Sequence, residues 1–222
     1  MLQTSVIVHN HPLLYLRAFT TSWPQPLEDI VDLTVVRKYF SQDQQHPLSS
    51  QKYTKSTVRD LLRYGGFKPS GRNKPAWEYL EKAISKEWFA PHKGINAAVD
   101  SCNAVSLHSK LPVSVLDLDK CIPPYCIKIC PEHTSYPFNP SGQILKADGL
   151  IALFDAYGPC GTPVKDAQRT KTEPTTQKTL SIIWGHIDLA SYVDEATEWY
   201  LSLLAQMSCT TSAAQLIHKR EE

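Results

Sequence analysis

The stretch from Ile95 to Lys120, INAAVDSCNAVSLHSKLPVSVLDLDK, carries the strongest indication of the fold. It predicts a helix over residues 96–107 and then a strand over residues 113–118. Asn96, Asp100 and Asn103 lie four and three residues apart, so they share one face of the expected helix. The opposite side is apolar. The polar face is therefore either turned to solvent or the wall of a polar pocket.

The segments on either side of this stretch mix helices and strands without strict alternation. Further strands are expected within residues 1–20, where Pro12 interrupts the pattern, and at 33–36, 125–130, 150–154 and 180–184. Further helices are expected at residues 56–64, 75–89 and 191–214. This order predicts an α+β fold, a mixed β-sheet flanked by helices.

Composition is that of an ordinary globular protein. The chain has 222 residues, 42% of them hydrophobic and 20% charged, with a formal net charge of +1. This length suits one large domain, with a core that needs no metal or disulfide, so we expect a single domain over residues 1–222. The longest apolar runs, such as residues 149–154, are far shorter than the ~20 residues of a membrane span.

The first ten residues lack the basic and apolar regions of a signal peptide. We therefore expect a cytoplasmic protein, in which the six cysteines are reduced thiols.

Positive charge is concentrated in two places. Residues 51–93 hold ten basic and four acidic side chains, a local charge of +6. A smaller cluster comprises Lys165, Arg169, Lys171 and Lys178. A basic surface on a nearly neutral protein suits a polyanion that approaches one face, although a solvated helix face gives the same pattern.

Two basic loops combine turn-forming residues with cationic donors: GGFKPSGRNKP at residues 65–75 and GPCGTPVKDAQRTKT at residues 158–172. Such loops can hold a phosphate or a carbonyl group. In a purely structural alternative, Asp166 and Arg169 pair with each other and shape their loop.

The cysteines offer weaker candidates. Cys121, Cys126, Cys130 and His133 match no common zinc spacing, and an extended segment would separate Cys126 from Cys130 by ~13 Å. Buried thiols are favoured over a metal site. Cys160 could act as a nucleophile with His108, His133 or His186 as base, but a structural thiol in a tight loop is the favoured interpretation.

Five segments together resemble one family. Residues 95–120 and KADGLIALFDAYG at 146–158 resemble the B-three/B-four domain of the phenylalanyl-tRNA synthetase beta subunit, which hydrolyses mischarged tyrosyl-tRNA. FKPSGRNKPAWEYL at 67–80, FNPSGQ at 138–143 and the loop at 158–172 resemble free-standing proteins of that superfamily. The resemblance covers about residues 58–185.

The resemblance implies positions for the editing pocket. Asn103 falls on the family's asparagine, Cys102 on the threonine before it, and Gly158 and Gly161 fall near the pocket glycines. The editing histidine falls on Ser114, which cannot act as an imidazole base, and the glutamate that recognises tyrosine falls near Ile182.

The expected function is a trans-acting aminoacyl-tRNA deacylase that uses no cofactor or metal. The expected catalytic residues are Asn103, Ser114, Asp166 and Arg169. The expected substrate-binding residues are Cys102, Gly158, Gly161, Lys165 and Gln168, and the tRNA-binding residues are Lys68, Arg72, Lys74 and Lys171. Two alternatives remain: a non-catalytic tRNA-binding module of the same fold, and a small-molecule hydrolase that uses Cys160.

Overall fold

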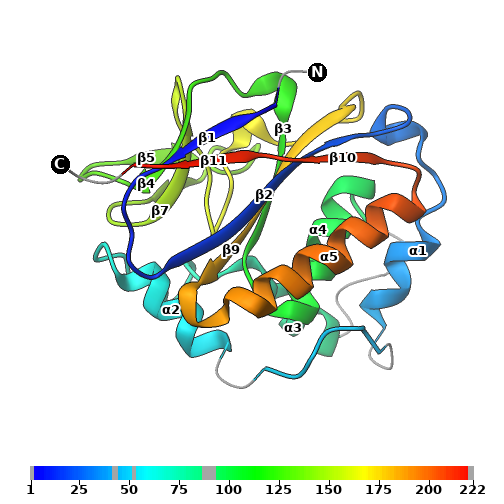
Figure 1. The fold of residues 1–222 in the computed structure, drawn as a ribbon, viewed down its shortest axis with the longest axis horizontal. Coiled ribbons are helices and arrows are strands. Elements are labelled where there is room, and N and C mark those ends of the chain that lie inside the picture. The colour runs from blue at the N-terminus through cyan, green and yellow to red at the C-terminus, as the bar shows by residue number, and fades with distance from the viewer. Residues whose placement is uncertain (1–2, 42–44, 52–53, 87–93, 220–222) are drawn as a thin grey trace.

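Two β-sheets and a short two-stranded ribbon carry the strands (Figure 1). The computed structural model describes residues 3–41, 45–51, 54–86 and 94–219. The five-stranded sheet has the order β11 (Gln215–His218), β1 (Ser5–Val8), β4 (Tyr125–Ile129), β7 (Ile151–Asp155) and β8 (Gly158–Gly161). The four-stranded sheet has the order β10 (Thr210–Ala213), β2 (Leu14–Ser22), β9 (Lys178–His186) and β3 (Val113–Asp117). The ribbon pairs β5 (Ser135–Pro137) with β6 (Ile144–Lys146).

The five-stranded sheet is mixed. β1 pairs in parallel with both β11 and β4, whereas β4, β7 and β8 pair antiparallel. The expected α+β fold with a mixed sheet is therefore confirmed.

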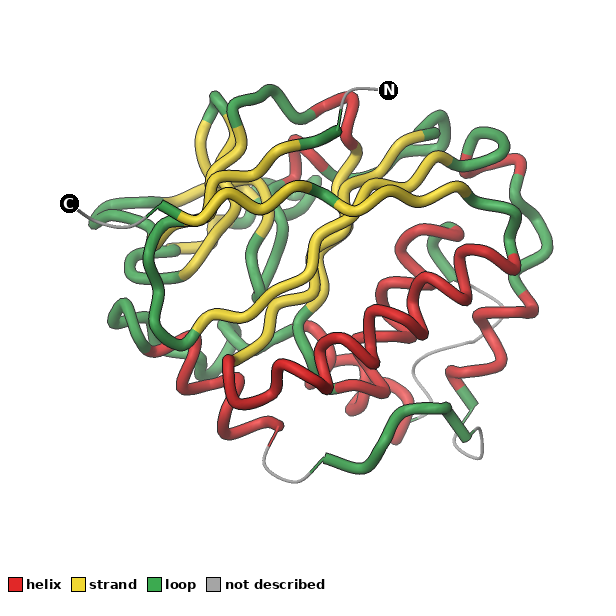
Figure 2. The backbone as a smooth tube through the Cα atoms, viewed as in Figure 1, coloured by secondary structure: helices red, strands yellow, loops and turns green. Residues whose placement is uncertain are grey.

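The helices gather on one side of the strands (Figure 2). They are α1 (Thr34–Arg37), α2 (Thr54–Arg63), α3 (Ala76–Ser85), α4 (Ala97–Ser109) and α5 (Ala190–Gln206). α5 packs on β2 and β9, and α4 packs on α3, α5 and β3. Every residue of β9 after Lys178 is buried, which shows that this central strand is covered on both faces. None of the described helices combines the length and apolar character that crossing a membrane would require.

The stretch that decides the fold forms its expected elements. α4 begins where the Asn96 side chain accepts a hydrogen bond from the Val99 N–H at 2.9 Å. It ends at Lys110, whose φ of 58° is left-handed. β3 follows, antiparallel to β9. The helix and strand that carry the candidate residues are thus adjacent in space.

Two expected elements are wrong. Residues 34–37 form a helix and not a strand, because the Asp32 carboxylate accepts hydrogen bonds from the Thr34 N–H and hydroxyl, and Val36 is buried in the helical conformation. The last helix ends at Gln206 and not near residue 214, because residues 210–218 form β10 and β11 along the sheet edges. The sequence pattern also missed β5, β6 and β8. The expected helix end at residue 89 lies outside the described residues.

Candidate functional site

A cavity of about 290 Å³ lies between α4, β3 and the loop that follows β8. Its lining residues are Ala76, Ile95, Val99, Cys102, Asn103, Val113, Val115, Thr162, Pro163, Val164, Lys165, Asp166, Lys171 and Thr172. Five of the candidate site residues meet here: Cys102, Asn103, Lys165, Asp166 and Lys171. They come from two segments that are more than 50 residues apart in the chain.

The three polar residues on this face of α4 make different contacts. Asn96 caps the helix, and its Nδ2 donates to the Thr172 hydroxyl at 3.2 Å. Asp100 is buried beside the helix start, where Oδ2 accepts from Arg37 Nε at 3.1 Å and Oδ1 from the Ile95 N–H at 2.9 Å. Only Asn103 of the three lines the cavity. The pocket-wall alternative therefore applies to that one residue.

Asp166 is the carboxylate of the cavity. Its Oδ1 accepts a hydrogen bond from the Thr162 N–H at 2.9 Å. Burial raises the pKa of Asp166 to about 6, although Ser114, the Thr162 N–H and the charge of Lys171 all oppose the shift. The side chain is thus mostly ionised at pH 7 and close to its titration range.

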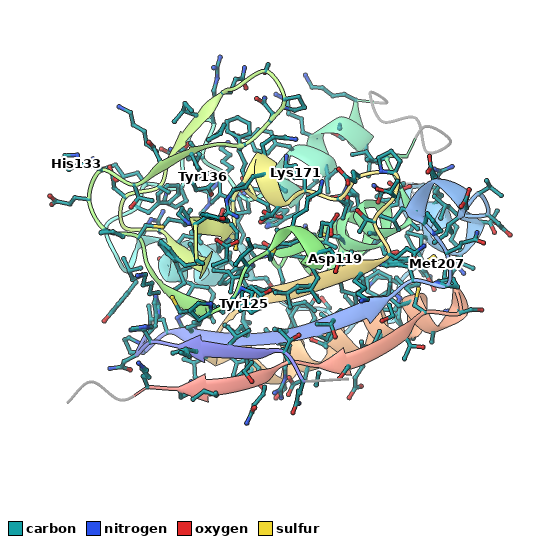
Figure 3. All side chains as sticks on the ribbon, turned by 90° about the horizontal axis from the view of Figure 1, so that it is seen from above. Asp119, Tyr125, His133, Tyr136, Lys171 and Met207 are labelled. Atoms are coloured by element: carbon teal, nitrogen blue, oxygen red, sulfur yellow. The ribbon has the colours of Figure 1, made fainter. Side chains whose placement is uncertain are left out.

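Lys171 lies opposite this carboxylate. Its Nζ donates to the Phe138 carbonyl at 2.6 Å, and burial lowers its pKa while the charge of Asp166 raises it. Tyr136 braces the same loop, because its hydroxyl donates to the Lys165 carbonyl at 2.7 Å. Figure 3 labels Tyr136 and Lys171 in the region where β5 meets the loop after β8.

Ser114 lies behind the cavity wall and does not line it. The side chain is fully buried, and its hydroxyl donates to the Thr162 carbonyl at 3.1 Å and accepts from Trp184 Nε1 at 3.0 Å. Since β3 side chains alternate, Val113 and Val115 face the cavity while Ser114 faces away. Of the four expected catalytic residues, Asn103 and Asp166 line the cavity, whereas Ser114 and Arg169 do not.

Arg169 is held elsewhere by an ion pair. Its two terminal nitrogens donate to the carboxylate of Asp155 at 2.7 and 2.6 Å, and one of them also donates to the Gly158 carbonyl at 3.0 Å. The alternative in which Arg169 pairs with Asp166 is wrong. The guanidinium instead makes two charge-assisted hydrogen bonds to the buried carboxylate of Asp155 at the end of β7, while Asp166 accepts from the Thr162 N–H.

The remaining expected substrate residues support the loop from outside. Gly158, Gly161 and Gln168 do not line the cavity. A Cβ at Gly161 would lie 3.7 Å from Asp166 Oδ1 and 3.1 Å from a Leu116 methyl group, so Gly161 lets the strand pass close behind the carboxylate. The Gln168 Oε1 is buried and has no hydrogen-bond partner among the described residues.

A basic groove of about 590 Å³ adjoins the cavity. It is lined by Arg72, Asn73, Phe138, Gln143, Ile144, Leu145, Lys146 and Lys165. Lys165 lines both hollows: its Nζ donates to the Arg72 carbonyl at 2.9 Å and lies 4.1 Å from the centre of the Phe138 ring. Of the expected tRNA-binding residues, Arg72 lies in the groove and Lys171 in the cavity, whereas Lys68 and Lys74 lie outside both.

The contacts of the cysteines favour structural thiols over a metal site or a nucleophile. All six thiols are free. Among the described residues, the ligand-type side chains that cluster within 4.8 Å are Cys121, Asp155 and Cys160, a different set from the one the spacing suggested. Cys160 donates to the Leu153 carbonyl, and the neighbouring Cys121 together with burial raises its thiol pKa far above the usual range. Such a thiol is a poor nucleophile.

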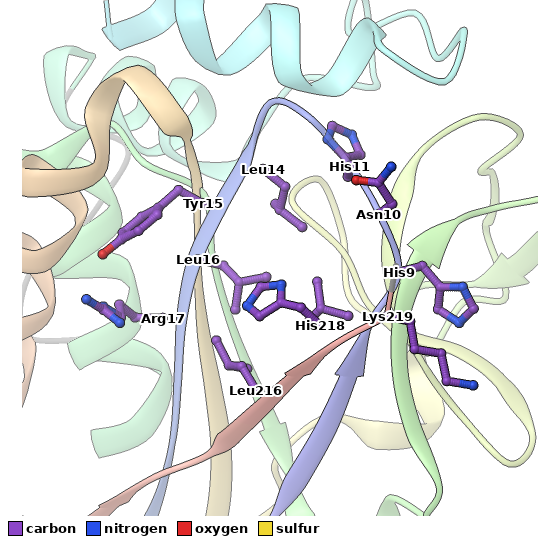
Figure 4. A pocket seen from close by; sticks show the side chains of 11 residues that line it. His9, Asn10, His11, Leu14, Tyr15, Leu16, Arg17, Leu216, His218 and Lys219 are labelled. Atoms are coloured by element: carbon purple, nitrogen blue, oxygen red, sulfur yellow. The ribbon is translucent and has the colours of Figure 1, made fainter. Parts of the chain in front are cut away.

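A histidine-rich hollow of about 340 Å³ escaped the sequence analysis (Figure 4). It lies between β2 and the pair of β1 and β11, with His9, His11 and His218 among its lining residues. Arg17, which also lines it, is held by Asp194 at 2.6 Å. His9 and His11 lie in the loop between β1 and β2, whereas His218 lies in β11 near the other end of the chain, so no local spacing signalled all three.

The comparisons with known proteins agree with this architecture. No protein-family pattern matches the sequence, and no curated protein sequence matches it. By fold alone, the chain is similar to a solved α+β structure. In particular, it resembles the crystal structure of an N-terminal fragment of the phenylalanyl-tRNA synthetase beta subunit from Pyrococcus horikoshii, with a TM-score of 0.51 and 10% identity. The likeness covers 97% of this chain and 52% of that fragment, so this chain spans about half the length of the fragment.

Proposed function

We propose that the chain binds the aminoacylated 3′ end of a tRNA and hydrolyses the ester that joins the amino acid to the terminal ribose. One observation carries the proposal: a small cavity with an amide and a carboxylate meets a basic groove at Lys165. The aminoacyl group occupies the cavity, and the RNA end lies along the groove. The fold likeness to a tRNA synthetase fragment supports an RNA role.

The groove has the chemistry that a single-stranded RNA end requires. Arg72, Lys146 and Lys165 supply positive charge for phosphates, and Phe138 supplies an aromatic surface next to Lys165. Unpaired bases stack on aromatic side chains, and basic side chains hold the backbone. The groove therefore suits the unpaired acceptor end better than a helical stem.

In this proposal, hydrolysis depends on how the ester is positioned and on the polar groups that face it. Asp166 holds the α-ammonium of the amino acid, and the Asn103 amide donates to the oxygen that becomes negative when water adds to the ester carbonyl. The bond between the carbonyl carbon and the ribose oxygen then breaks. The water proton passes to that oxygen, which leaves a free ribose hydroxyl and a free amino acid.

The test is release of amino acid from a panel of mischarged tRNAs, measured above the rate in buffer. We expect Asn103→Ala to lower kcat by at least about 10-fold, as expected for loss of an oxyanion donor. Lys165→Ala should raise KM and weaken its dependence on salt. Arg17→Ala serves as the control, because Arg17 lines neither the cavity nor the basic groove. Release that is equal for the wild type and Asn103→Ala would contradict this assignment.

A second candidate is a tRNA-binding module without catalysis. Ser114 and Arg169, two of the four residues expected to react, are both committed to internal partners, and this observation favours it. Tight binding of aminoacyl-tRNA with no release of amino acid above the buffer rate would select this candidate over the deacylase.

A further inference from the structure

We infer that the cavity selects an aminoacyl group with a small aliphatic side chain, of the size of alanine or valine, and excludes tyrosine. The inference rests on the proposed function, whose site it makes more specific. It follows from how the cavity walls divide into an apolar part and a polar part.

The apolar wall comes from α4 and β3. Val99, Cys102 and Asn103 stand three and four residues apart on one face of the helix. Val113 and Val115 stand two residues apart on one face of the strand. The regular spacing of both elements therefore brings three valines and a neutral thiol to the same surface.

The polar part comes from the loop after β8. Asp166 and Lys171 provide opposite charges, and Thr162 and Thr172 provide hydroxyl groups. Pro163 and Val164 from the same loop continue the apolar surface, and both are buried. A ligand with an ammonium, a carbonyl and a short hydrocarbon group matches these two parts together, as an aliphatic amino acid ester does.

Tyrosine fits poorly for two reasons. None of the described lining residues is aromatic, and the one carboxylate among them, Asp166, is needed for the ammonium. The position that the resemblance assigns to hydroxyl recognition, Ile182, is fully buried in β9 opposite Ser114 and does not line the cavity. A phenol placed against the valines would lose its hydrogen bonds to water, which the valine side chains cannot replace.

The expected selectivity has a characteristic order. An apolar pocket rejects a slightly different side chain by about 10- to 200-fold and discriminates weakly against an isosteric hydroxyl. We therefore expect valine and alanine esters to react fastest and threonine within about 100-fold of valine. Tyrosine should be slowest, at least about 100-fold below valine.

The experiment measures kcat/KM for tRNA that carries alanine, valine, threonine or tyrosine. Val113→Ala should enlarge the cavity and reduce the valine-to-tyrosine ratio several-fold. Val31→Ala, the same substitution at an exposed position, should leave the ratio unchanged. Faster release of tyrosine than of valine would overturn the inference and leave the proposed deacylase in place.

A binding measurement separates the two proposals. Calorimetry with valinamide, tyrosinamide and N-acetylvalinamide, which has no ammonium, reports the cavity without the reaction. We expect valinamide to bind most tightly and Asp166→Asn to abolish its advantage over the acetylated compound. If no ester is cleaved but this order holds, deacylation fails and the cavity assignment stands. Equal or absent binding of the three amides overturns the assignment.

Discussion

Two carboxylates, the buried Asp155 and the half-buried Asp166, show how a single partner sets the properties of a residue. Asp155 and Asp166 lie on either side of β8, one before the strand and one after it. Burial opposes ionisation of Asp155, but Arg169 and two backbone N–H groups outweigh it and hold its pKa below the usual value. Asp166 has no arginine partner, so burial dominates and its pKa is raised. Because the two pKa values are shifted in opposite directions, the two carboxylates change the stability of the fold in opposite directions as pH rises.

Asp166→Asn should change how stability depends on pH. Between about pH 4 and 6, folded Asp166 keeps a proton that the unfolded chain has lost, so its contribution to the free energy of unfolding falls as pH rises. The variant lacks this loss. We expect the stability of the variant relative to wild type to increase by roughly 2–3 kcal/mol from pH 4 to pH 7. Urea unfolding at a series of pH values measures it, and a constant difference would contradict it.

Arg169→Ala should destabilise the fold at neutral pH. It leaves the Asp155 carboxylate buried without its cation, which costs about 2–3 kcal/mol in a partly exposed pair of this kind. Arg17→Ala is the matched control, because Arg17 pairs with Asp194 where both side chains are exposed. Its loss should cost no more than about 1 kcal/mol. Equal free energies of unfolding for the two variants would show that the Arg169–Asp155 pair stabilises the fold no more than the exposed Arg17–Asp194 pair does.

At the scale of elements, the turn before β7 is tied to the end of α2 by a close approach of two glycines. A Cβ at Gly149 would lie 2.1 Å from the Gly65 carbonyl oxygen, and a Cβ at Gly65 would lie 2.3 Å from the Gly149 carbonyl oxygen. The φ of Gly149 is also +72°. Only glycine on both sides allows the backbones to meet here.

Gly149→Ala should therefore cost more than Gly142→Ala. The φ angles are nearly equal, +72° at Gly149 and +73° at Gly142, so each substitution carries the same backbone penalty of about 1 kcal/mol. Gly142 has open space around its Cβ position, whereas Gly149 meets the Gly65 backbone. We expect a further loss of about 1–3 kcal/mol in the free energy of unfolding for Gly149→Ala. Similar losses for both variants would mean that the two segments separate at little cost.

At the scale of the whole molecule, the two ends of the chain join the two sheets. β1 and β11 belong to the five-stranded sheet and β2 and β10 to the four-stranded sheet, so residues 5–22 and 210–218 each cross from one sheet to the other. A single large hydrophobic cluster includes buried residues of both sheets and of α4 and α5. We propose on this basis that the chain unfolds as one cooperative domain.

The cysteines provide a test of that cooperativity. Cys102 in α4, Cys160 in β8, and Cys121 and Cys130 in loops are buried, whereas Cys126 and Cys209 are partly exposed. A thiol reagent should label at most two cysteines rapidly in the native state and all six in denaturant. The four buried thiols should then react at one common rate, set by global opening. Mass spectrometry of labelled peptides measures these rates, and different rates would indicate separate units.

The elements around the site could be predicted from the sequence, because their apolar periodicities are local. It predicted α4, β3, β4, β7 and β9, and it singled out Asn103 and Asp166, which line one cavity. The folded arrangement was needed to show that residues 210–218 complete both sheets and that Ser114 turns inward. It also decided that Arg169 pairs with Asp155 in place of Asp166. The physical reason is that edge pairing and the choice between two carboxylates depend on which segments lie next to each other after folding, and no local pattern records that.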